Sequence, residues 1–186
     1  MIAWIIIGIL VVIVLYLILI YNSLITLKTR SEEAWSDITV QLKRRYDLIP
    51  NLVNAVKAYA KHERELFEKV TQARTAAISA KGIKDQQKAE NQISESLKSI
   101  FAVAENYPNL KANENFLNLQ GELMDTENKI EASRRFYNAN VRDFNIKIQS
   151  FPSSIIANSF KFTQKDLFEV EASQKDVIQN PPKVEV

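Results

Sequence analysis

The chain has 186 residues, and its 24 basic and 22 acidic side chains leave a net charge of +2. This near balance argues against a nucleic-acid-binding protein, which usually shows a basic stripe. The absence of cysteine excludes disulfides, thiolate chemistry and a lipid-modified cysteine. With only 3 Gly and 5 Pro, the chain has few positions that would interrupt a helix.

The first twenty residues form an apolar run. From Ile2 to Ile20 every residue is apolar, glycine or aromatic, and the first charged side chain is Lys28. About twenty helical residues rise roughly 30 Å, which matches the hydrocarbon core of a bilayer. A cleaved signal peptide is disfavoured because nothing basic precedes the run, the run is too long and no cleavage site follows it. We therefore expect residues 1–27 to be a transmembrane anchor that contacts lipid through residues 2–21.

The flanks of this run indicate its orientation. Lys28 and Arg30 follow it directly, and Lys and Arg favour the cytoplasmic side of a membrane. Trp4 and Tyr21 stand where the two headgroup layers would lie. We expect the N-terminus outside and the rest of the chain in the cytoplasm.

Apolar residues at three- and four-residue steps predict two helical segments after the anchor. The first stripe comprises Leu27, Ala34, Ile38, Leu42 and Ile49, and the second comprises Leu52, Val56, Tyr59, Leu66, Val70, Ala73 and Ala77. Pro50 separates them, so the helix either kinks or restarts there. Gly82 suits a left-handed cap after the second segment.

Two further helices are predicted, over residues 85–106 and 113–149. Tyr107-Pro108-Asn109 is expected to form a turn between them, and Asn113 to cap the second. That helix shows a seven-residue repeat, which favours long helices packed at shallow angles. Its repeating residues are Phe116, Leu123, Ile130, Tyr137 and Phe144.

The end of the chain is polar. Phe151-Pro152 should end the long helix, and the apolar residues up to Phe160 could fold back on the bundle as a short segment. We expect an all-α fold: an antiparallel up-and-down bundle of four helical segments over residues 28–160, after the transmembrane helix. Residues 161–186 form a polar tail, which we expect to be disordered from Glu171.

No motif for catalysis or metal binding is evident. His62 is the only histidine, and Leu66 stands where a zinc-protease motif needs a second one. The basic run Lys43-Arg44-Arg45 is interpreted as a solvated or partner-binding face. Glu127, Asn128, Arg134 and Arg135 indicate either a polar network with the Glu105–Asn109 turn or a partner-docking surface.

Several motifs in order resemble the LemA family of bacterial membrane-anchored proteins. They are the apolar span, RRYDLIPNLV (44–53), YAKHE (59–63), AENYPNL (104–110), TENKI (126–130), RRFYN (134–138) and Phe151-Pro152. Ala58 and Lys161 depart from the family pattern, which often has glycine there. The resemblance implies a single-pass protein of the bacterial inner membrane with an antiparallel helical bundle, and it does not imply an enzyme. No cofactor is expected.

These features together favour a membrane-tethered, non-enzymatic scaffold or adaptor. Other membrane proteins are the expected partners, and the resemblance suggests a membrane metalloprotease of the HtpX type and a link to envelope stress. Self-association stays open, as do an enzyme with a carboxylate–arginine site and a sensor module. The positions marked for partner contact or by the family motifs are Arg45, Pro50, Asn51, His62, Glu63, Tyr107, Pro108, Asn109, Glu127, Asn128, Arg134, Arg135, Tyr137 and Asn138.

Overall fold

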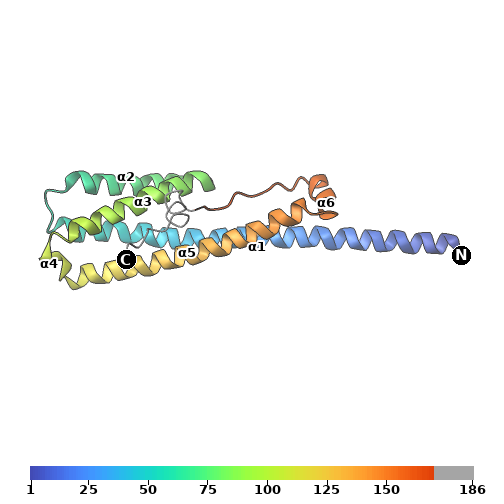
Figure 1. The fold of residues 1–186 in the computed structure, drawn as a ribbon, viewed down its shortest axis with the longest axis horizontal. Coiled ribbons are helices and arrows are strands. Elements are labelled where there is room, and N and C mark those ends of the chain that lie inside the picture. The colour runs from blue at the N-terminus through green and yellow to red at the C-terminus, as the bar shows by residue number, and fades with distance from the viewer. Residues whose placement is uncertain (170–186) are drawn as a thin grey trace, which may run out of the picture. The chain divides into compact units, whose positions relative to one another are not determined.

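A computed structural model of the chain describes residues 1–169, which form helices and no strands (Figure 1). This confirms the all-α prediction. The region predicted to be disordered, Glu171–Val186, lies outside the described residues. The helices are α1 (Ile2–Lys57), α2 (Arg64–Ser79), α3 (Ile83–Ala104), α4 (Pro108–Lys111), α5 (Glu114–Gln149) and α6 (Ser153–Ser159).

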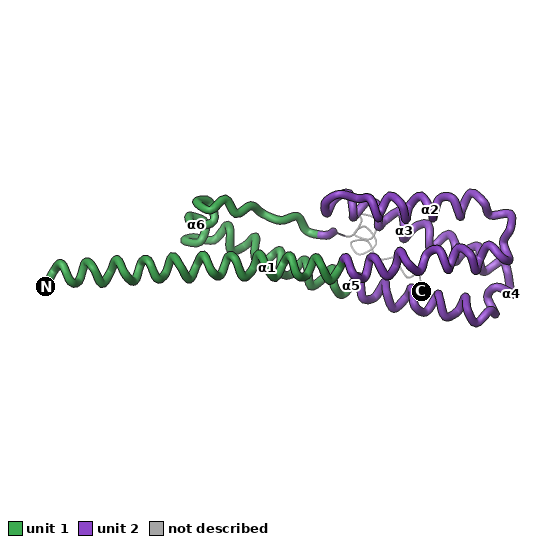
Figure 2. The backbone as a smooth tube through the Cα atoms, turned by 180° about the vertical axis from the view of Figure 1, so that it is seen from behind, with its two compact units in different colours: residues 1–38, 132–167 green, residues 39–131, 168–186 purple. Residues whose placement is uncertain are grey.

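The chain divides into two compact units, to both of which α1 and α5 contribute (Figure 2). Unit 1 contains residues 1–38 and 132–167. Unit 2 contains residues 39–131 and, among the residues described after α6, 168 and 169.

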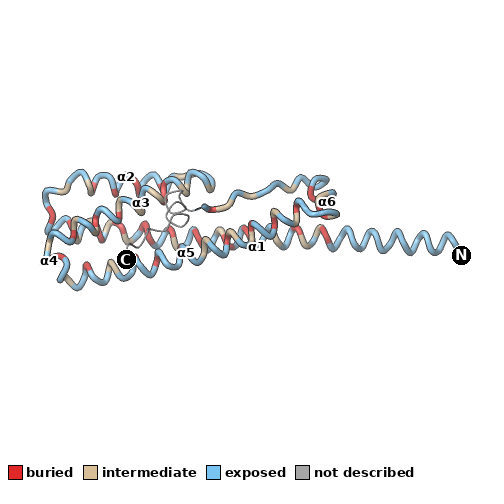
Figure 3. Tube along the Cα trace, viewed as in Figure 1, coloured by how far each residue is buried: buried red, intermediate tan, exposed pale blue. Residues whose placement is uncertain are grey.

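Unit 1 begins with the apolar run, which is exposed on all sides from Ile2 to Leu19 (Figure 3). Burial starts at Ile20, where α1 packs against α5 and α6. The core there comprises Ile20, Leu24, Phe144, Ile148 and Ala157, with Leu27, Ile156 and Phe162 packed against it. A helical segment that exposes apolar side chains on every side over this length is what a lipid-facing membrane span requires.

Unit 2 is a bundle of helices that run alternately in opposite directions: α1 from Thr39, then α2, α3 and the first part of α5 (Figure 2). Each helix buries one stripe. The stripe of α2 comprises Phe67, Val70, Ala73 and Ala77, and that of α3 includes Ile93, Leu97, Ile100 and Ala104. Short connections between neighbours account for the antiparallel order.

The seven-residue repeat of α5 is buried throughout. Its residues Phe116, Leu123, Ile130, Tyr137 and Phe144 are all core residues. At its start the Oδ1 of Asn113 accepts a hydrogen bond of 3.1 Å from the backbone N–H of Phe116, so the predicted cap is formed. The left-handed cap expected at the end of α2 is not formed: α2 ends at Ala80 in an extended conformation, and Gly82, with φ of +80° and ψ of 169°, is instead the N-cap of α3.

Two further features differ from expectation. The Tyr107–Asn109 turn leads into a one-turn helix, α4, which begins at Pro108 because proline suits the first helical position. The tail expected from residue 161 is packed at its start: Asn145 Nδ2 donates to the carbonyl of Lys165 and Asn145 Oδ1 accepts from its N–H, both at 2.9 Å. The ordered chain therefore extends past the predicted boundary at residue 160.

Candidate functional site

One core row of α1 repeats every seven residues, like the repeat of α5. It comprises Leu24, Ser31, Ile38, Arg45 and Leu52, all of them buried. Two of these five positions are polar. Ser31 lies in unit 1, where its hydroxyl accepts a hydrogen bond of 2.7 Å from Lys165 Nζ. Arg45 lies in unit 2, where an arginine takes a position that coiled helices normally give to an apolar residue.

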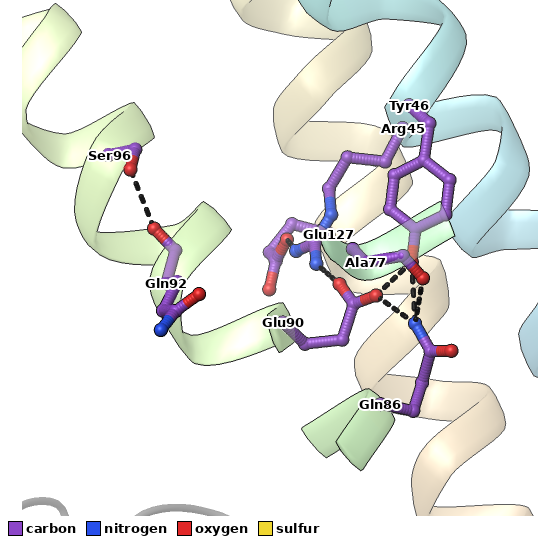
Figure 4. Close-up of polar contacts among 8 residues, drawn as sticks. All are labelled: Arg45, Tyr46, Ala77, Gln86, Glu90, Gln92, Ser96 and Glu127. Atoms are coloured by element: carbon purple, nitrogen blue, oxygen red, sulfur yellow. Dashed lines mark hydrogen bonds and ion pairs between the residues drawn. The ribbon is translucent and has the colours of Figure 1, made fainter. Parts of the chain in front are cut away.

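Arg45 is only 2% exposed and pairs with two carboxylates (Figure 4). Its Nη2 forms an ion pair with Glu90 of α3, and its Nη1 lies 2.5 Å from the Oε2 of Glu127 on α5. A buried guanidinium is tolerated only when it is paired in this way. One side chain of α1 therefore fixes the neighbouring turns of two other helices.

The Arg45–Glu90 pair is extended by Tyr46 and Gln86, which complete a polar cluster (Figure 4). The hydroxyl of Tyr46 donates to Glu90 Oε1. Gln86 Nε2 donates to the same oxygen over 2.6 Å and to the Tyr46 hydroxyl over 2.7 Å. Burial raises the pKa of Tyr46 from 10.0 to about 12, against smaller opposing effects of the Arg45 charge and the Gln86 hydrogen bond. The tyrosine therefore stays a neutral donor in the physiological range.

The cluster leaves one donor unused. Arg45 Nε is buried and has no hydrogen-bond partner among residues 1–169. Arg45 and Glu90 are buried, whereas Gln86 is half-buried and Glu127 has a side chain 54% exposed. Tyr46 and Gln86 also line a surface pocket of about 310 Å³. The buried contacts of Arg45 and Tyr46 with Glu90 fix the register of α1 against α3.

Pro50 lies inside α1, and the helix continues through it to Lys57. A proline has no N–H, so the carbonyl four residues earlier, that of Tyr46, loses its helical donor. Arg74 of α2 replaces that donor: its Nε donates to the Tyr46 carbonyl over 2.7 Å. Of the two alternatives at Pro50, a kink or a restart, the restart is excluded, because α1 is continuous through the proline.

An open groove of about 1030 Å³ runs beside α2 in unit 2. Val53, Phe67 and Ala76 give it apolar surface. Its charged residues are Lys57, Lys61, Arg64 and Glu68, of which Arg64 and Glu68 are paired at 2.8 Å. The groove therefore combines apolar surface with a net basic rim.

Several motif residues of unit 2 lie in or beside the connections between its helices. His62, Pro108 and Asn109 are exposed, Glu63 and Tyr107 are half-buried, and Asn51 is exposed on α1. The connection between α1 and α2 and the residues just before α5 are linked by a hydrogen bond of 3.2 Å, which Asn113 Nδ2 donates to the Tyr59 hydroxyl.

The residues predicted as one surface on α5 have separate environments. Glu127 pairs with Arg45 rather than with the Glu105–Asn109 turn, and Asn128 is exposed. Tyr137 is buried in unit 1, where it donates to the Asp166 carbonyl over 2.9 Å and packs against Trp35. Arg134, Arg135 and Asn138 lie in unit 1 too, and each is engaged in contacts there or elsewhere in the chain.

Arg45 also corrects the interpretation of the basic run. Lys43 and Arg44 are exposed, and Arg44 lies 3.5 Å from Asp125, but Arg45 points into the core. The interpretation of the basic run as a solvated face therefore holds for Lys43 and Arg44 but is wrong for Arg45.

Four residues of the site were not identified from the sequence: Tyr46, Arg74, Gln86 and Glu90. The seven-residue row from Leu24 to Leu52 would have placed Arg45 inside, and Pro50 signals an unpaired carbonyl at Tyr46.

The fold and the site define a helical-bundle protein with one helix, among those described, that is long and apolar enough to cross a membrane. A sequence model of the LemA family matches residues 34–185, more than half of the chain. The chain belongs to the LemA family, as its motifs indicated.

Relatives of known name are distant. Protein LemA of Metamycoplasma hominis is 27% identical over 159 residues, which cover 85% of this chain and 70% of that protein. Magnetosome proteins MamQ 1 and MamQ 2 of Paramagnetospirillum magneticum are each 23% identical over 175 residues, or 80% of this chain. The chain spans 64% of the length of these magnetosome relatives.

Proposed function

We propose that this protein is a membrane-tethered, non-enzymatic scaffold or adaptor that acts through protein contacts. The observation that carries the proposal is that one helix, α1, supplies both the apolar run and part of the bundle core. Its residues Ile2–Leu19 are exposed and apolar, and its buried row ends at Leu52. Tethering raises the local concentration of the bundle at the membrane, so that weak contacts with other membrane proteins suffice.

The Arg45 cluster supports a scaffold over an enzyme with a carboxylate–arginine site. Arg45 and Glu90 would be the natural members of such a site, but both are buried and paired with each other. The occurrence of this family's sequence in proteins named LemA and in magnetosome proteins also fits a reusable framework better than one reaction.

We place the partner contact at the groove beside α2. Its apolar surface and its basic rim of Lys57 and Lys61 fit an acidic, amphipathic segment, which would dock as a helix does in a groove. A membrane metalloprotease of the HtpX type remains the named candidate from the family resemblance.

The proposed location is the bacterial inner membrane, with the N-terminus outside and the bundle in the cytoplasm, because Lys28 and Arg30 follow the span. Since the chain has no cysteine of its own, a Lys98→Cys variant carries a single reactive thiol on an exposed position of α3. A membrane-impermeant maleimide should label it only after the cells are permeabilised. Equal labelling of intact cells would reverse the orientation.

The contact itself is tested by photo-crosslinking in cells. A benzophenone amino acid replaces Gln72, which lines the groove, and in the control it replaces Lys98, which is exposed but does not line it. We expect a discrete product with a membrane protein from position 72 alone. The product should disappear in a Lys57→Glu/Lys61→Glu background that keeps its helix content. Equal products from both positions would argue against the groove.

A further inference from the structure

The end of α5 and helix α6 form an apolar projection on unit 1. Phe151 is 83% exposed, Phe160 60% and Ile155 57%. Soluble surfaces rarely gather large apolar side chains at this exposure, so such a patch marks a contact with a protein or a membrane.

The projection lies against α1 at the end of its apolar run (Figure 1). The ring of Phe160 lies 4.7 Å from that of Tyr21, and the ring of Phe162 lies 6.1 Å from it. One surface hollow is lined by Tyr16 and Ile20 together with Phe151 and Pro152. The exposed residues of the projection are therefore continuous with the exposed surface of the anchor.

The register along α1 sets the depth of this contact. Tyr16 precedes Tyr21 by five residues, or roughly 7.5 Å of helix. If Tyr21 lies in the headgroup layer, as expected for an aromatic at the end of a span, the hollow that Phe151 lines, which reaches along α1 from Leu27 to Tyr16, ends at the boundary with the acyl chains. Interfacial segments bury their apolar face to a similar depth, about 5–10 Å.

We propose that the α5–α6 projection is a second membrane-contacting element, which inserts Phe151 and Ile155 into the interfacial layer beside the anchor. The proposal rests on the anchor function proposed above. Two exposed basic residues adjoin these elements in the chain: Lys161 follows α6, and Lys28 follows the apolar run. Their charges favour a leaflet rich in anionic lipid.

Spin labelling of the full chain in anionic phospholipid vesicles tests this directly. Because the chain lacks cysteine, Phe151→Cys and Ile155→Cys each give one labelling site, on side chains that are exposed and whose replacement leaves the core of unit 1 intact. Leu10→Cys serves as the reference within the span, and Lys98→Cys as the reference in water. The quantity measured is the accessibility of each label to oxygen relative to a polar nickel reagent.

We expect labels at 151 and 155 to show an oxygen-to-nickel ratio several-fold above that at 98 and nearer to that at 10. A ratio at 151 equal to that at 98, with position 10 in lipid, would overturn the insertion and leave the anchor intact. Water-like behaviour at position 10 would instead overturn the anchor, and the insertion with it. Low access to both reagents at 151, with spin–spin broadening that fades on dilution with lipid, would assign the projection to a second copy and overturn the proposal.

Discussion

Arg74 donates a hydrogen bond from Nε to the carbonyl oxygen of Tyr46 over 2.7 Å. In a regular helix the N–H of residue 50 would donate to that carbonyl, but Pro50 has no N–H and leaves it without a helical donor. The link therefore lets a proline remain inside a long helix, and it holds α2 against α1 at the same point.

Replacement of Arg74 by Ala should destabilise unit 2 by about 1.5 kcal/mol, the usual contribution of a hydrogen bond from a charged group. The loss should be smaller in a Pro50→Ala background, where the substituted alanine would supply its own N–H to the Tyr46 carbonyl. Urea unfolding of the four chains in detergent micelles measures the coupling between the two positions. Additive effects would show that Arg74 does not compensate for Pro50.

Arg45→Met should cost about 3–5 kcal/mol, because it leaves the buried Glu90 carboxylate without its cation. Arg45→Met combined with Glu90→Met and Tyr46→Phe should recover most of that loss, since the apolar replacements leave neither a buried charge nor the Tyr46 hydroxyl without its acceptor. Glu127→Gln should have a much smaller effect because that side chain is half exposed. Equal unfolding midpoints for the single and triple variants would contradict a register-fixing ion pair.

The chain should lose stability as the pH rises from about 10 to 12. Burial raises the pKa of Tyr46 from 10.0 to about 12, and burial with the nearby Asp166 charge raises that of Tyr137 to about 12. A raised pKa stabilises the fold fully below the unfolded value of 10.0, and this contribution is lost as the pH passes through the folded value. Tyr46→Phe should flatten the fall in urea midpoint over this window. An unchanged slope in the variant would exclude Tyr46 as a cause.

Lys161→Gly should stabilise the chain by about 0.5–1 kcal/mol, because Lys161 has a φ of +57°, in the left-handed region that a side chain disfavours and glycine accepts. Lys161→Val is the matched control and should lower the thermal midpoint, because a β-branched residue fits this conformation worst. A lower midpoint for the glycine variant would show that contacts of the lysine outweigh its backbone cost.

The sequence predicted the fold well because its periodic signals are local. The α5 repeat from Phe116 to Phe144 and the Asn113 cap each depend on residues near in sequence, and both are formed. Gly82 marks the connection between α2 and α3 as expected, but it caps the start of α3 rather than the end of α2. The site was predicted less well because its contacts cross the bundle. In the sequence, Glu90 cannot be distinguished from the surface carboxylates of α3, because its ion pair with Arg45 forms only when α1 packs beside α3.

The residues of the α5 motifs show the same limit. The seven-residue spacing placed Glu127 and Arg134 on one face of the helix. Spacing along a single helix does not predict which residues of other helices contact that face. Glu127 meets Arg45 in unit 2, whereas Arg134 belongs to unit 1. One polar surface in the sequence thus divides between two environments in the structure.

The central claim is that the anchor supplies location while the bundle supplies specificity. The most direct measurement is the crosslink yield from position 72 in cells, after residues 2–20 are replaced by an unrelated apolar helix of equal length and orientation. We expect the same crosslinked product with the exchanged anchor, and its loss when Lys57→Glu and Lys61→Glu are introduced beside the native anchor. Loss of the product on exchange of the anchor, with its retention after the charge reversal, would show that the anchor and not the groove selects the partner.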